Sequence, residues 1–292
     1  MVSPFLADLF ESHRTHLLSV AYRLTGSVGD AEEAVQESWL RMAGVHQSEI
    51  DDLRAWLLTE VSRICLDHLR SAAVRRQTYV GQWLPEPIVS VGNSTRELDA
   101  VVRDRDCAMA AMVALDALTA QQRVALVLHR GQYMSFDEIA AILEISASAA
   151  KELAVRVHHT PDVAADDVHD LAVRRFLAAL ATDDVAAVIA TLHPEATFTA
   201  DAGGKTETAL NIVAGQEKIA RLALFLWRAH QSEQGLEMRD ATVNGQSGLI
   251  ITDPNSPFGR PVRVLGFAVK DEKIWAAYDF ANPAKLSGAR LP

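Results

Sequence analysis

The sequence is poor in cysteine, with two among its 292 residues. Cys65 and Cys107 each stand in an apolar helical pattern, and neither belongs to a Cys-x-x-Cys or Cys/His spacing. These spacings exclude a disulfide scaffold and a structural zinc site, and they fit a reducing cytoplasm. We therefore expect a cytoplasmic protein that holds no metal and no other cofactor.

Long apolar runs and positive charge are also scarce. No run approaches the length of about 20 residues that crosses a bilayer, and residues 1–10 lack the basic start of a secretory signal. We expect no membrane contact. The formal net charge is −10, which excludes indiscriminate binding to nucleic acid because phosphate contacts need a basic surface. Any nucleic-acid role must depend on local basic patches.

The apolar pattern divides the chain into parts, as its length of 292 residues suggests. Helical spacing predicts a bundle over residues 5–77 and a second helical block over 96–160. Between them, the prolines Pro85 and Pro87 interrupt the pattern, so 78–95 is predicted to be a linker with an apolar docking patch. The remainder, 166–292, is predicted to be α+β. Its expected helices are 168–182 and 215–230, and its expected strands are 196–199, 248–252, 262–269 and 273–280.

The predicted helix over residues 54–76 carries a row of charged side chains opposite its apolar stripe. Arg63, Asp67 and Arg70 are spaced at i, i+4 and i+7, and Arg75 and Arg76 extend the row. Guanidinium groups can contact phosphates and stack on unpaired bases. The alternative is a solvated helix face with an Arg63–Asp67 ion pair.

The segment from Ser135 to His159 predicts two short helices joined by a tight turn. Ser135 with Glu138 has the spacing of a capping box, as Asp30 with Glu33 does at the start of an earlier helix. The second helix is expected to turn Ser148, Lys151, Glu152, Val155, Arg156 and His159 outward. Such a pair is either a helix-turn-helix that enters a DNA major groove or an ordinary corner of a bundle.

The last polar features lie in the α+β part. Paired glycines at 203 and 204 permit positive φ and close approach, and Asp201 and Lys205 beside them either pair with each other or face a cavity. Arg239, Asp240 and Asp279 form an acid/base cluster if they face one pocket. Because nothing in the spacing sets that geometry, no catalytic residue is predicted.

Taken together, these segments resemble an extracytoplasmic-function sigma factor of the group with a fused C-terminal SnoaL-like domain. Residues 21–27, 30–41, 54–57 and 67–71 are similar to sigma region 2. The linker Tyr79–Pro87 resembles the signature linker of this group, 201–205 resembles its Asp-Gly-Gly-Gly-Lys turn, and 282–286 resembles its Asn-Pro-Asp-Lys-Leu motif. The resemblance implies a multidomain fold class: two all-α sigma domains, region 2 and a region 4 helix-turn-helix, and a C-terminal α+β cone.

The resemblance also implies partners and residues, with no enzymatic activity. RNA polymerase core would bind Asp30, Glu33, Gln36, Glu37 and Trp39. Promoter DNA would meet Arg63, Arg70, Arg75 and Arg76 at the minus-ten element, and Ser146, Ser148, Lys151 and Arg156 at the minus-thirty-five element. The C-terminal domain would regulate in cis and take a small ligand in its pocket. Its interdomain residues would be Trp83, Leu84, Pro85, Asp201, Lys205, Asn282, Pro283 and Lys285.

The sequence departs from the family pattern in the second helical block. Glu144 stands where relatives have a glycine, at a cost on the order of 1 kcal/mol if the turn needs positive φ. Glu152 has the wrong charge for phosphate, and Val155 offers no hydrogen bond to a base. Two alternatives stay open: a degenerate sigma protein with weak or no minus-thirty-five recognition, and a C-terminal domain with ligand-binding, hydrolase or cyclase activity.

Overall fold

The computed structural model describes residues 4–45, 50–92, 97–155, 163–232, 235–253 and 261–287. The chain forms two compact units. The first contains Met1–Gln77, Arg96–Cys107 and Ala111–Thr160, and the second contains Thr78–Thr95, Ala108–Ala110 and Pro161–Pro292. The linker thus belongs to the same unit as the C-terminal part. The bounds predicted for the four segments, 5–77, 78–95, 96–160 and 166–292, stay predictions. Across the described ranges, we find no helix both long and apolar enough to span a bilayer.

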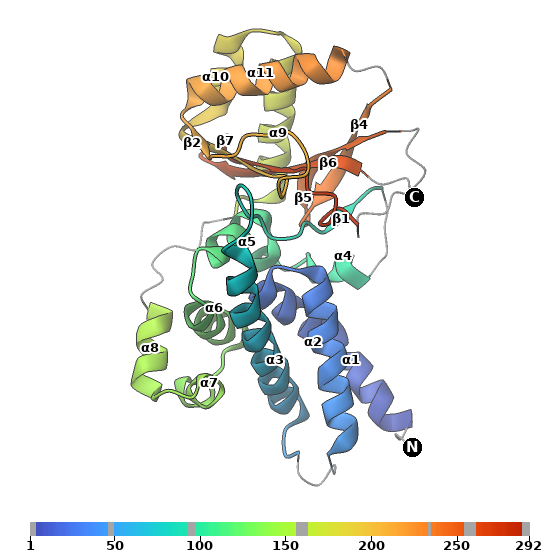
Figure 1. Ribbon diagram of the computed structural model, residues 1–292, viewed down its shortest axis with the longest axis vertical. Helices are drawn as coiled ribbons and strands as arrows, with labels where there is room; N and C mark the ends of the chain where they lie inside the picture. Colours follow the sequence, from blue (N-terminus) through green and yellow to red (C-terminus); the bar gives the residue numbers. More distant parts are fainter. Residues whose placement is uncertain are drawn as a thin grey trace. The chain divides into compact units, whose positions relative to one another are not determined.

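The first unit is helical (Figure 1). Its N-terminal helices are α1 (Pro4–Thr25), α2 (Val28–Gly44) and α3 (Leu53–Arg76), which pack pairwise against one another. Its later helices are α4 (Glu97–Val101), η2 (Arg105–Cys107), α5 (Met109–Asp116), α6 (Ala120–Leu126), the π-helical turn η3 (Val127–Gly131), α7 (Phe136–Leu143) and α8 (Ala147–Val155). The N-terminal and the later helices form one unit because α3 also packs against α6 and α7.

Helix starts follow local capping chemistry, with one correction to the sequence analysis. The Oγ of Ser135 accepts from the backbone N–H of Glu138, whose carboxylate accepts from Ser135 in return, so the predicted capping box is confirmed. The prediction for Asp30 is wrong. Ser27 caps α2 by accepting from the N–H of Asp30, because the helix begins one turn earlier, at Val28.

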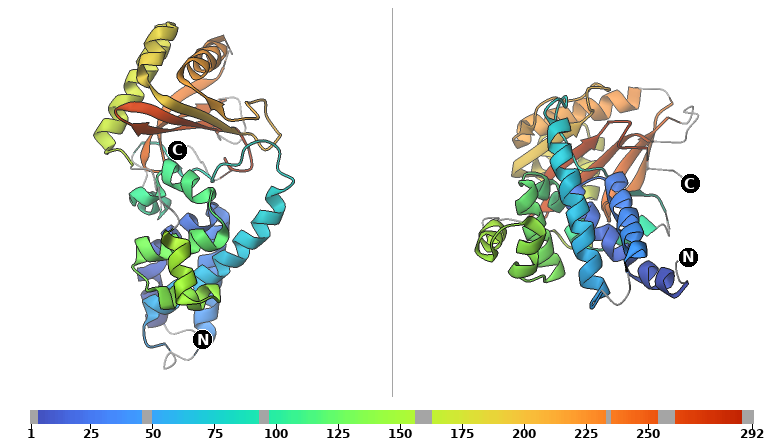
Figure 2. Two further views of the ribbon diagram at one scale, coloured as in Figure 1. Left: turned by 90° about the vertical axis from the view of Figure 1, so that its left-hand side faces the viewer. Right: turned by 60° about the horizontal axis from the view of Figure 1, so that its bottom comes forward.

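The second unit contains one seven-stranded sheet with helices on one face (Figures 1 and 2). The strands are β1 (Val89–Ser90), β2 (Leu192–Asp201), β3 (Val213–Ala214), β4 (Glu237–Val243), β5 (Gln246–Thr252), β6 (Pro261–Lys270) and β7 (Lys273–Phe280), in the order β1-β4-β5-β6-β7-β2-β3. Neighbours are antiparallel except β2 and β7. The helices are α9 (Asp166–Ala181), α10 (Val185–Thr191) and α11 (Gln216–Ser232). The four predicted strands and both helices are confirmed.

The core of this unit lies between its helices and its sheet. Phe176 of α9, Val188 of α10 and Leu224 of α11 are buried against Phe198 of β2 and Phe267 of β6. The Phe176 and Phe267 rings meet edge to face at 5.8 Å between centroids. Inward-facing apolar side chains on alternate strand positions thus supply one half of the core and the helix stripes supply the other.

The linker extends the sheet by one short strand. Val89 and Ser90 of β1 pair with Val243 and Thr242 of β4. Just before β1, the N–H of Ile88 donates to the side-chain oxygen of Asn244 at 3.0 Å, and the N–H of Asn244 donates to the Ile88 carbonyl at 2.8 Å. Asn244 adopts φ 51°, a left-handed conformation that Asn tolerates better than most residues. The linker is therefore part of the C-terminal sheet.

Candidate promoter, polymerase and linker sites

Arg63 and Arg70, two of the arginines predicted to contact the minus-ten element, are exposed on helix α3. Arg63 and Arg70 have side chains 47% and 57% exposed, and each pairs with an acid three residues earlier, Glu60 at 3.1 Å and Asp67 at 3.2 Å. The alternative of an Arg63–Asp67 ion pair is therefore wrong, because Arg63 pairs with Glu60 and Asp67 pairs with Arg70. Such surface pairs contribute at most about 1 kcal/mol, so both guanidinium groups can exchange their carboxylate for a phosphate.

The end of α3 is arranged differently, because Asp116 of α5 binds two arginines. Arg76 Nη1 lies 2.7 Å from Asp116 Oδ1, and Arg123 Nη2 of α6 lies 3.3 Å from the same atom. Arg123 is 2% exposed, and burial lowers its pKa to about 10. Arg76 is therefore held inside the first unit rather than presented with Arg63 and Arg70. The side chain of Arg75 lies outside the described residues.

The predicted polymerase face of α2 is partly exposed. Glu33 and Gln36 point to solvent, and Leu40, which completes an i, i+3, i+7 line with them, is 62% exposed. Trp39 is half-buried, with its ring centroid 5.0 Å from that of Phe10. Glu37 is also half-buried and pairs with Arg41 at 2.5 Å.

Near the start of α2, Asp30 Oδ1 lies 4.0 Å from His68 Nδ1 of α3. Asp30 is half-buried, and Glu33, Gln36 and Leu40 remain the outward line of the helix. Leu40 is thus an exposed apolar side chain in an otherwise polar row.

Helices α7 and α8 form the predicted pair, joined by three residues. Ser146 caps α8 by accepting from the N–H of Ala149 at 3.2 Å. Ser148, Lys151 and Val155 are exposed on α8, which confirms the predicted outward face, while Arg156 and His159 lie outside the described residues. The geometry is that of a helix-turn-helix, in which the outward face of the second helix faces DNA.

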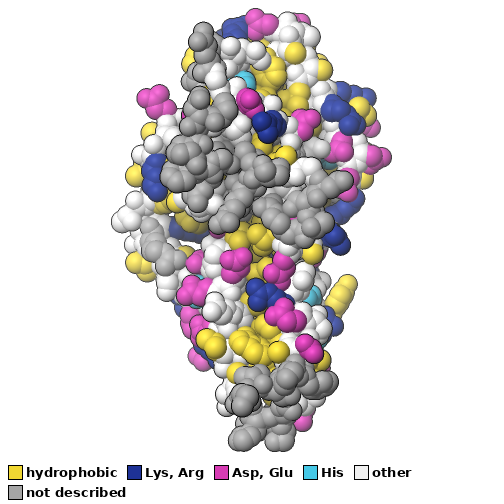
Figure 3. Space-filling model, turned by 90° about the vertical axis from the view of Figure 1, so that its right-hand side faces the viewer, with side chains coloured by type: hydrophobic (Ala, Val, Ile, Leu, Met, Phe, Trp, Pro, Cys, Tyr) yellow, Lys and Arg dark blue, Asp and Glu magenta, His cyan; other side chains and the backbone are white. Residues whose placement is uncertain are grey.

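Charge on the visible surface is mixed rather than segregated. On the face drawn in Figure 3, acidic and basic side chains are interspersed over the described residues. Interspersed charges produce no broad positive potential.

The linker is held in the second unit by a buried carboxylate, Asp201, at the end of β2. Asp201 is fully buried, and its Oδ2 lies 2.5 Å from Lys285 Nζ and accepts from the N–H of Leu84 at 2.9 Å. Its other oxygen accepts from the hydroxyl of Tyr79. Lys285 Nζ also donates to the Leu84 carbonyl. The side chain that pairs with Asp201 is thus Lys285, and Lys205, the partner considered in the sequence analysis, is exposed on the turn.

Aromatic rings of the linker close over this ion pair. Lys285 Nζ lies 3.2 Å from the centroid of the Trp83 ring, a cation–π contact, and the Trp83 and Tyr79 rings meet edge to face at 5.0 Å. Asn282 donates to the Tyr79 hydroxyl at 2.8 Å. Three segments far apart in sequence therefore form one site, which we name the linker clamp: Tyr79, Trp83, Leu84, Asp201, Asn282 and Lys285.

Glycine is required beside the linker clamp. Gly203 has φ 56°, and a Cβ there would lie 2.5 Å from the Asn282 Nδ2 atom and 3.0 Å from the Tyr79 hydroxyl. The prediction of positive φ and close approach is therefore confirmed. Pro85 is buried with the linker, whereas Pro283 is exposed beside Asn282.

A second buried carboxylate, Asp279, is the next-to-last residue of β7, three residues before Asn282. Arg263 Nη1 of β6 donates to Asp279 Oδ2 at 2.7 Å, and Thr208 Oγ1 donates to the same oxygen at 3.2 Å. Burial raises the pKa of Asp279 to about 6 although Arg263 opposes the rise. The cluster considered with Arg239 is not formed, because Arg239 pairs with Glu237 on the exposed face of β4.

Comparison with known proteins assigns both helical regions of the chain. Residues 9–75 match the model of Sigma-70 region 2, and residues 108–157 match that of Sigma-70, region 4. Both regions on one chain define a sigma-70-type factor and confirm the predicted helical sigma domains, while the seven-stranded sheet with its helices confirms the predicted C-terminal α+β domain.

Relatives match the chain over almost its whole length. The ECF RNA polymerase sigma factor SigJ of Mycobacterium tuberculosis is 44% identical over 97% of this chain and 93% of its own length. Its crystal structure superposes with a TM-score of 0.80 at 41% identity, over 97% of this chain and 98% of that one. A probable ECF RNA polymerase sigma factor from the same species, SigI, is 29% identical over 96% of this chain and 94% of its own length. The chain belongs to the ECF RNA polymerase sigma factor family.

Proposed function

We propose that this protein binds the RNA polymerase core in the cytoplasm and directs it to a small set of promoters. The observation that carries the proposal is that a chain with both sigma regions keeps Arg63 and Arg70 exposed along α3. Their weak surface pairs leave them available to single-stranded DNA. The chemistry of RNA synthesis then belongs to the polymerase, and this chain acts without catalysis of its own.

The polymerase contact is assigned to α2. Glu33, Gln36 and Leu40 form an exposed line along the helix, with Asp30, Glu37 and Trp39 half-buried beside it. An apolar side chain flanked by acidic and amide groups suits a basic, partly apolar helical surface on the polymerase.

Promoter contacts are divided between α3 and α8. The minus-ten strand meets Arg63 and Arg70, with Arg75 and Arg76 at the end of the helix. The minus-thirty-five element meets Ser146, Ser148, Lys151 and Arg156. Arg76 joins only after Asp116 releases it, because the 2.7 Å ion pair occupies its guanidinium.

The linker clamp is assigned a regulatory role. The linker joins α3 to α4, and therefore connects the two sigma regions. In the linker clamp, Asp201, Asn282 and Lys285 bind the linker through Tyr79, Trp83 and Leu84. Pro85 of the linker is buried, and Lys205 and Pro283 lie on the adjoining turns. A linker fastened along its length cannot extend freely, so the clamp limits how far the two regions separate.

Run-off transcription with core polymerase on a promoter library tests the proposal, with the full chain compared with a form truncated before Val168. Transcripts from the full chain or the truncated form are expected, and the difference between them measures the control by the C-terminal domain. If neither form yields transcripts or binds polymerase, the proposal is wrong.

A second candidate is a degenerate sigma protein that binds polymerase without reading the minus-thirty-five element. It is favoured by α8, whose exposed face presents Glu152 and Val155 next to Lys151. A carboxylate repels phosphate and a valine offers no hydrogen bond to a base edge. Normal affinity of the full chain for a duplex minus-thirty-five element would exclude this candidate.

A further inference from the structure

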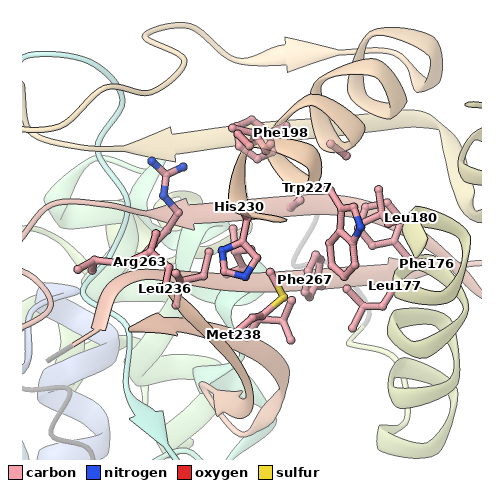
Figure 4. A pocket seen from close by; sticks show the side chains of 18 of the residues that line it. Phe176, Leu177, Leu180, Phe198, Trp227, His230, Leu236, Met238, Arg263 and Phe267 are labelled. Carbon is pink, nitrogen blue, oxygen red and sulfur yellow. The ribbon is translucent and has the colours of Figure 1, made fainter. Parts of the chain in front are cut away.

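Acidic side chains of this protein hold arginines in two different ways. In the C-terminal unit, Arg263 lines the apolar cavity between the helices and the sheet (Figure 4) and donates to the fully buried Asp279 at 2.7 Å. In the first unit, Glu60 of α3 is shared by two arginines, Arg41 of α2 and Arg63 of α3. A shared carboxylate can release one arginine and still keep the other.

Glu60 connects α2 and α3, which pack side by side (Figure 1). Its Oε2 atom accepts from Arg41 Nη1 at 2.9 Å, and its Oε1 atom accepts from Arg63 Nη1 at 3.1 Å. Arg41 also donates to Glu37 Oε1, from Nε at 3.1 Å and from Nη2 at 2.5 Å. Four side chains thus form a continuous line of alternating charge, which we name the charge row: Glu37, Arg41, Glu60 and Arg63.

Burial differs along the charge row. The side chain of Glu60 is 13% exposed, whereas the other three members are between 41% and 47% exposed. A largely buried carboxylate without a partner is costly, so Arg63 can leave Glu60 at low cost only while Arg41 stays. The hydrogen bond to Glu60 is also the main cause that raises the pKa of Arg41 above its ordinary value. Arg41 is therefore the partner that compensates Glu60 when Arg63 leaves.

The end of α3 repeats this arrangement. Asp116 Oδ1 binds Arg76, one of the arginines predicted to contact DNA, and also binds Arg123 of α6. The buried Arg123 can keep Asp116 paired when Arg76 leaves, as Arg41 can for Glu60. Two arginines of one helix are thus each held by an acid that has a second arginine partner.

We infer that Glu60 is a positioning residue for promoter contact: it holds Arg63 until a DNA phosphate takes its place, and Arg41 keeps Glu60 paired afterwards. The inference rests on the proposed function, in which Arg63 meets the minus-ten strand and Glu37 meets the polymerase. When a basic polymerase group binds Glu37, the Nε and Nη2 donors of Arg41 become free to bind both oxygens of Glu60. Arg63 then loses its carboxylate, so polymerase binding favours the DNA contact.

A double-mutant cycle on the full chain tests the exchange on Glu60, with fluorescence anisotropy of a short labelled oligothymidylate as the readout. Arg41→Gln should weaken binding about 2- to 5-fold, the range of one partly exposed ion pair, because Glu60 then retains Arg63. In the Glu60→Gln background, the effect of Arg41→Gln should be at least about 2-fold smaller. Equal effects in both backgrounds would show that Arg41 acts through its own charge, and would overturn the inference. Failure of the Glu60→Gln chain to bind the oligonucleotide would also overturn it.

Glu37→Gln imitates the capture of Glu37 by polymerase. It should strengthen oligonucleotide binding more than Glu32→Gln, which removes the same charge from an exposed position of α2. The difference between these two variants should vanish when Arg41→Gln is added, because Arg41 transmits it. If Glu37→Gln and Glu32→Gln have equal effects in the unsubstituted background, the inference is wrong.

Run-off transcription separates this inference from the proposed function. Transcripts from a protein in which the Arg41 and Glu60 substitutions act independently would refute the inference alone. Coupled effects of these substitutions in a protein that neither binds polymerase nor supports transcription would refute the proposed function and leave the exchange on Glu60 standing.

Discussion

Glu144 ends α7 in the left-handed region, with φ 58° and ψ 44°. A side chain with a Cβ is disfavoured there by about 1–2 kcal/mol, and a glycine at this position would be free of that cost. Its N–H still donates to the Ala140 carbonyl, so the turn keeps its hydrogen bond. The strain expected from the sequence is therefore present, and the helix-turn-helix forms despite it.

Replacing Glu144 by glycine should raise the free energy of unfolding by about 0.5–1 kcal/mol. The gain is smaller than the relieved strain because glycine has more freedom in the unfolded chain. Urea denaturation followed by circular dichroism measures it. Glu152→Gly, inside α8, is the control and should lose about 1 kcal/mol. An unchanged or lower stability for Glu144→Gly would contradict the argument.

Asp279 makes stability depend on pH. Its pKa is raised from 3.8 to about 6 by burial, so the folded state binds more protons than the unfolded chain between these values. The contribution of Asp279 is fully present below pH 3.8 and is lost as pH rises through about 6. The loss is roughly 3 kcal/mol, at about 1.4 kcal/mol per pKa unit.

The free energy of unfolding of Asp279→Asn, measured beside the unsubstituted protein from pH 3.5 to pH 7, checks this dependence. The unsubstituted protein should lose stability relative to the variant as pH rises, because an amide does not titrate. Parallel curves would show that the pKa of Asp279 is the same in the folded and unfolded states, so that Arg263 fully offsets the effect of burial.

At the scale of elements, the middle of α3 differs from its C-terminal end. Its middle presents Arg63 and Arg70 in weak surface pairs, and its end is tied to α5 and α6 through Asp116. The same helix therefore offers an accessible stretch for DNA and a stretch that holds the first unit together. Only the accessible stretch is expected to act as a simple phosphate contact.

Arg70→Ala should weaken open-complex formation by the holoenzyme several-fold and lower its log–log salt slope by about 0.7, the value for one phosphate contact on single-stranded DNA. Arg221→Ala is the matched control. Arg221 is likewise an exposed helical arginine paired with an acid, Glu217 at 2.6 Å, but it lies on α11. Equal effects of the two substitutions would remove the assigned role of α3.

At the scale of the whole molecule, the linker has two roles in one segment. It connects the sigma regions in sequence, yet β1 belongs to the C-terminal sheet and Leu84 is gripped by Asp201 and Lys285. A buried ion pair is strongly destabilised when one partner is removed, by about 3–5 kcal/mol. The linker clamp can therefore be opened by a single substitution.

Lys285→Met should change run-off transcription in the same direction as truncation before Val168, because it leaves Asp201 uncompensated and loosens the linker. Lys205→Met, on the exposed turn, should transcribe like the unsubstituted protein. Transcription by Lys285→Met that is unchanged while truncation has an effect would show that the C-terminal domain acts through other contacts.

Much of this protein follows from the sequence alone. Apolar spacing predicts the helices of both sigma regions, because burial of one face sets that spacing. The Ser135–Glu138 capping box and the glycines beside Asp201 likewise follow from local chemistry. Motifs such as the linker Tyr79–Pro87 indicate the family, since they combine several residues in a set order.

What the sequence does not determine is which distant side chains meet. The pairing of Asp201 with Lys285, the attachment of Arg76 to Asp116 and the burial of Arg123 each join residues whose separation in sequence carries no signal. Local rules describe the dihedral angles and faces of one element, whereas ion pairs and pockets arise where several elements pack. Tertiary structure therefore decided that the linker belongs to the C-terminal unit and that the ion pair of Asp201 with Lys285 is buried there, because only packing removes those charges from water.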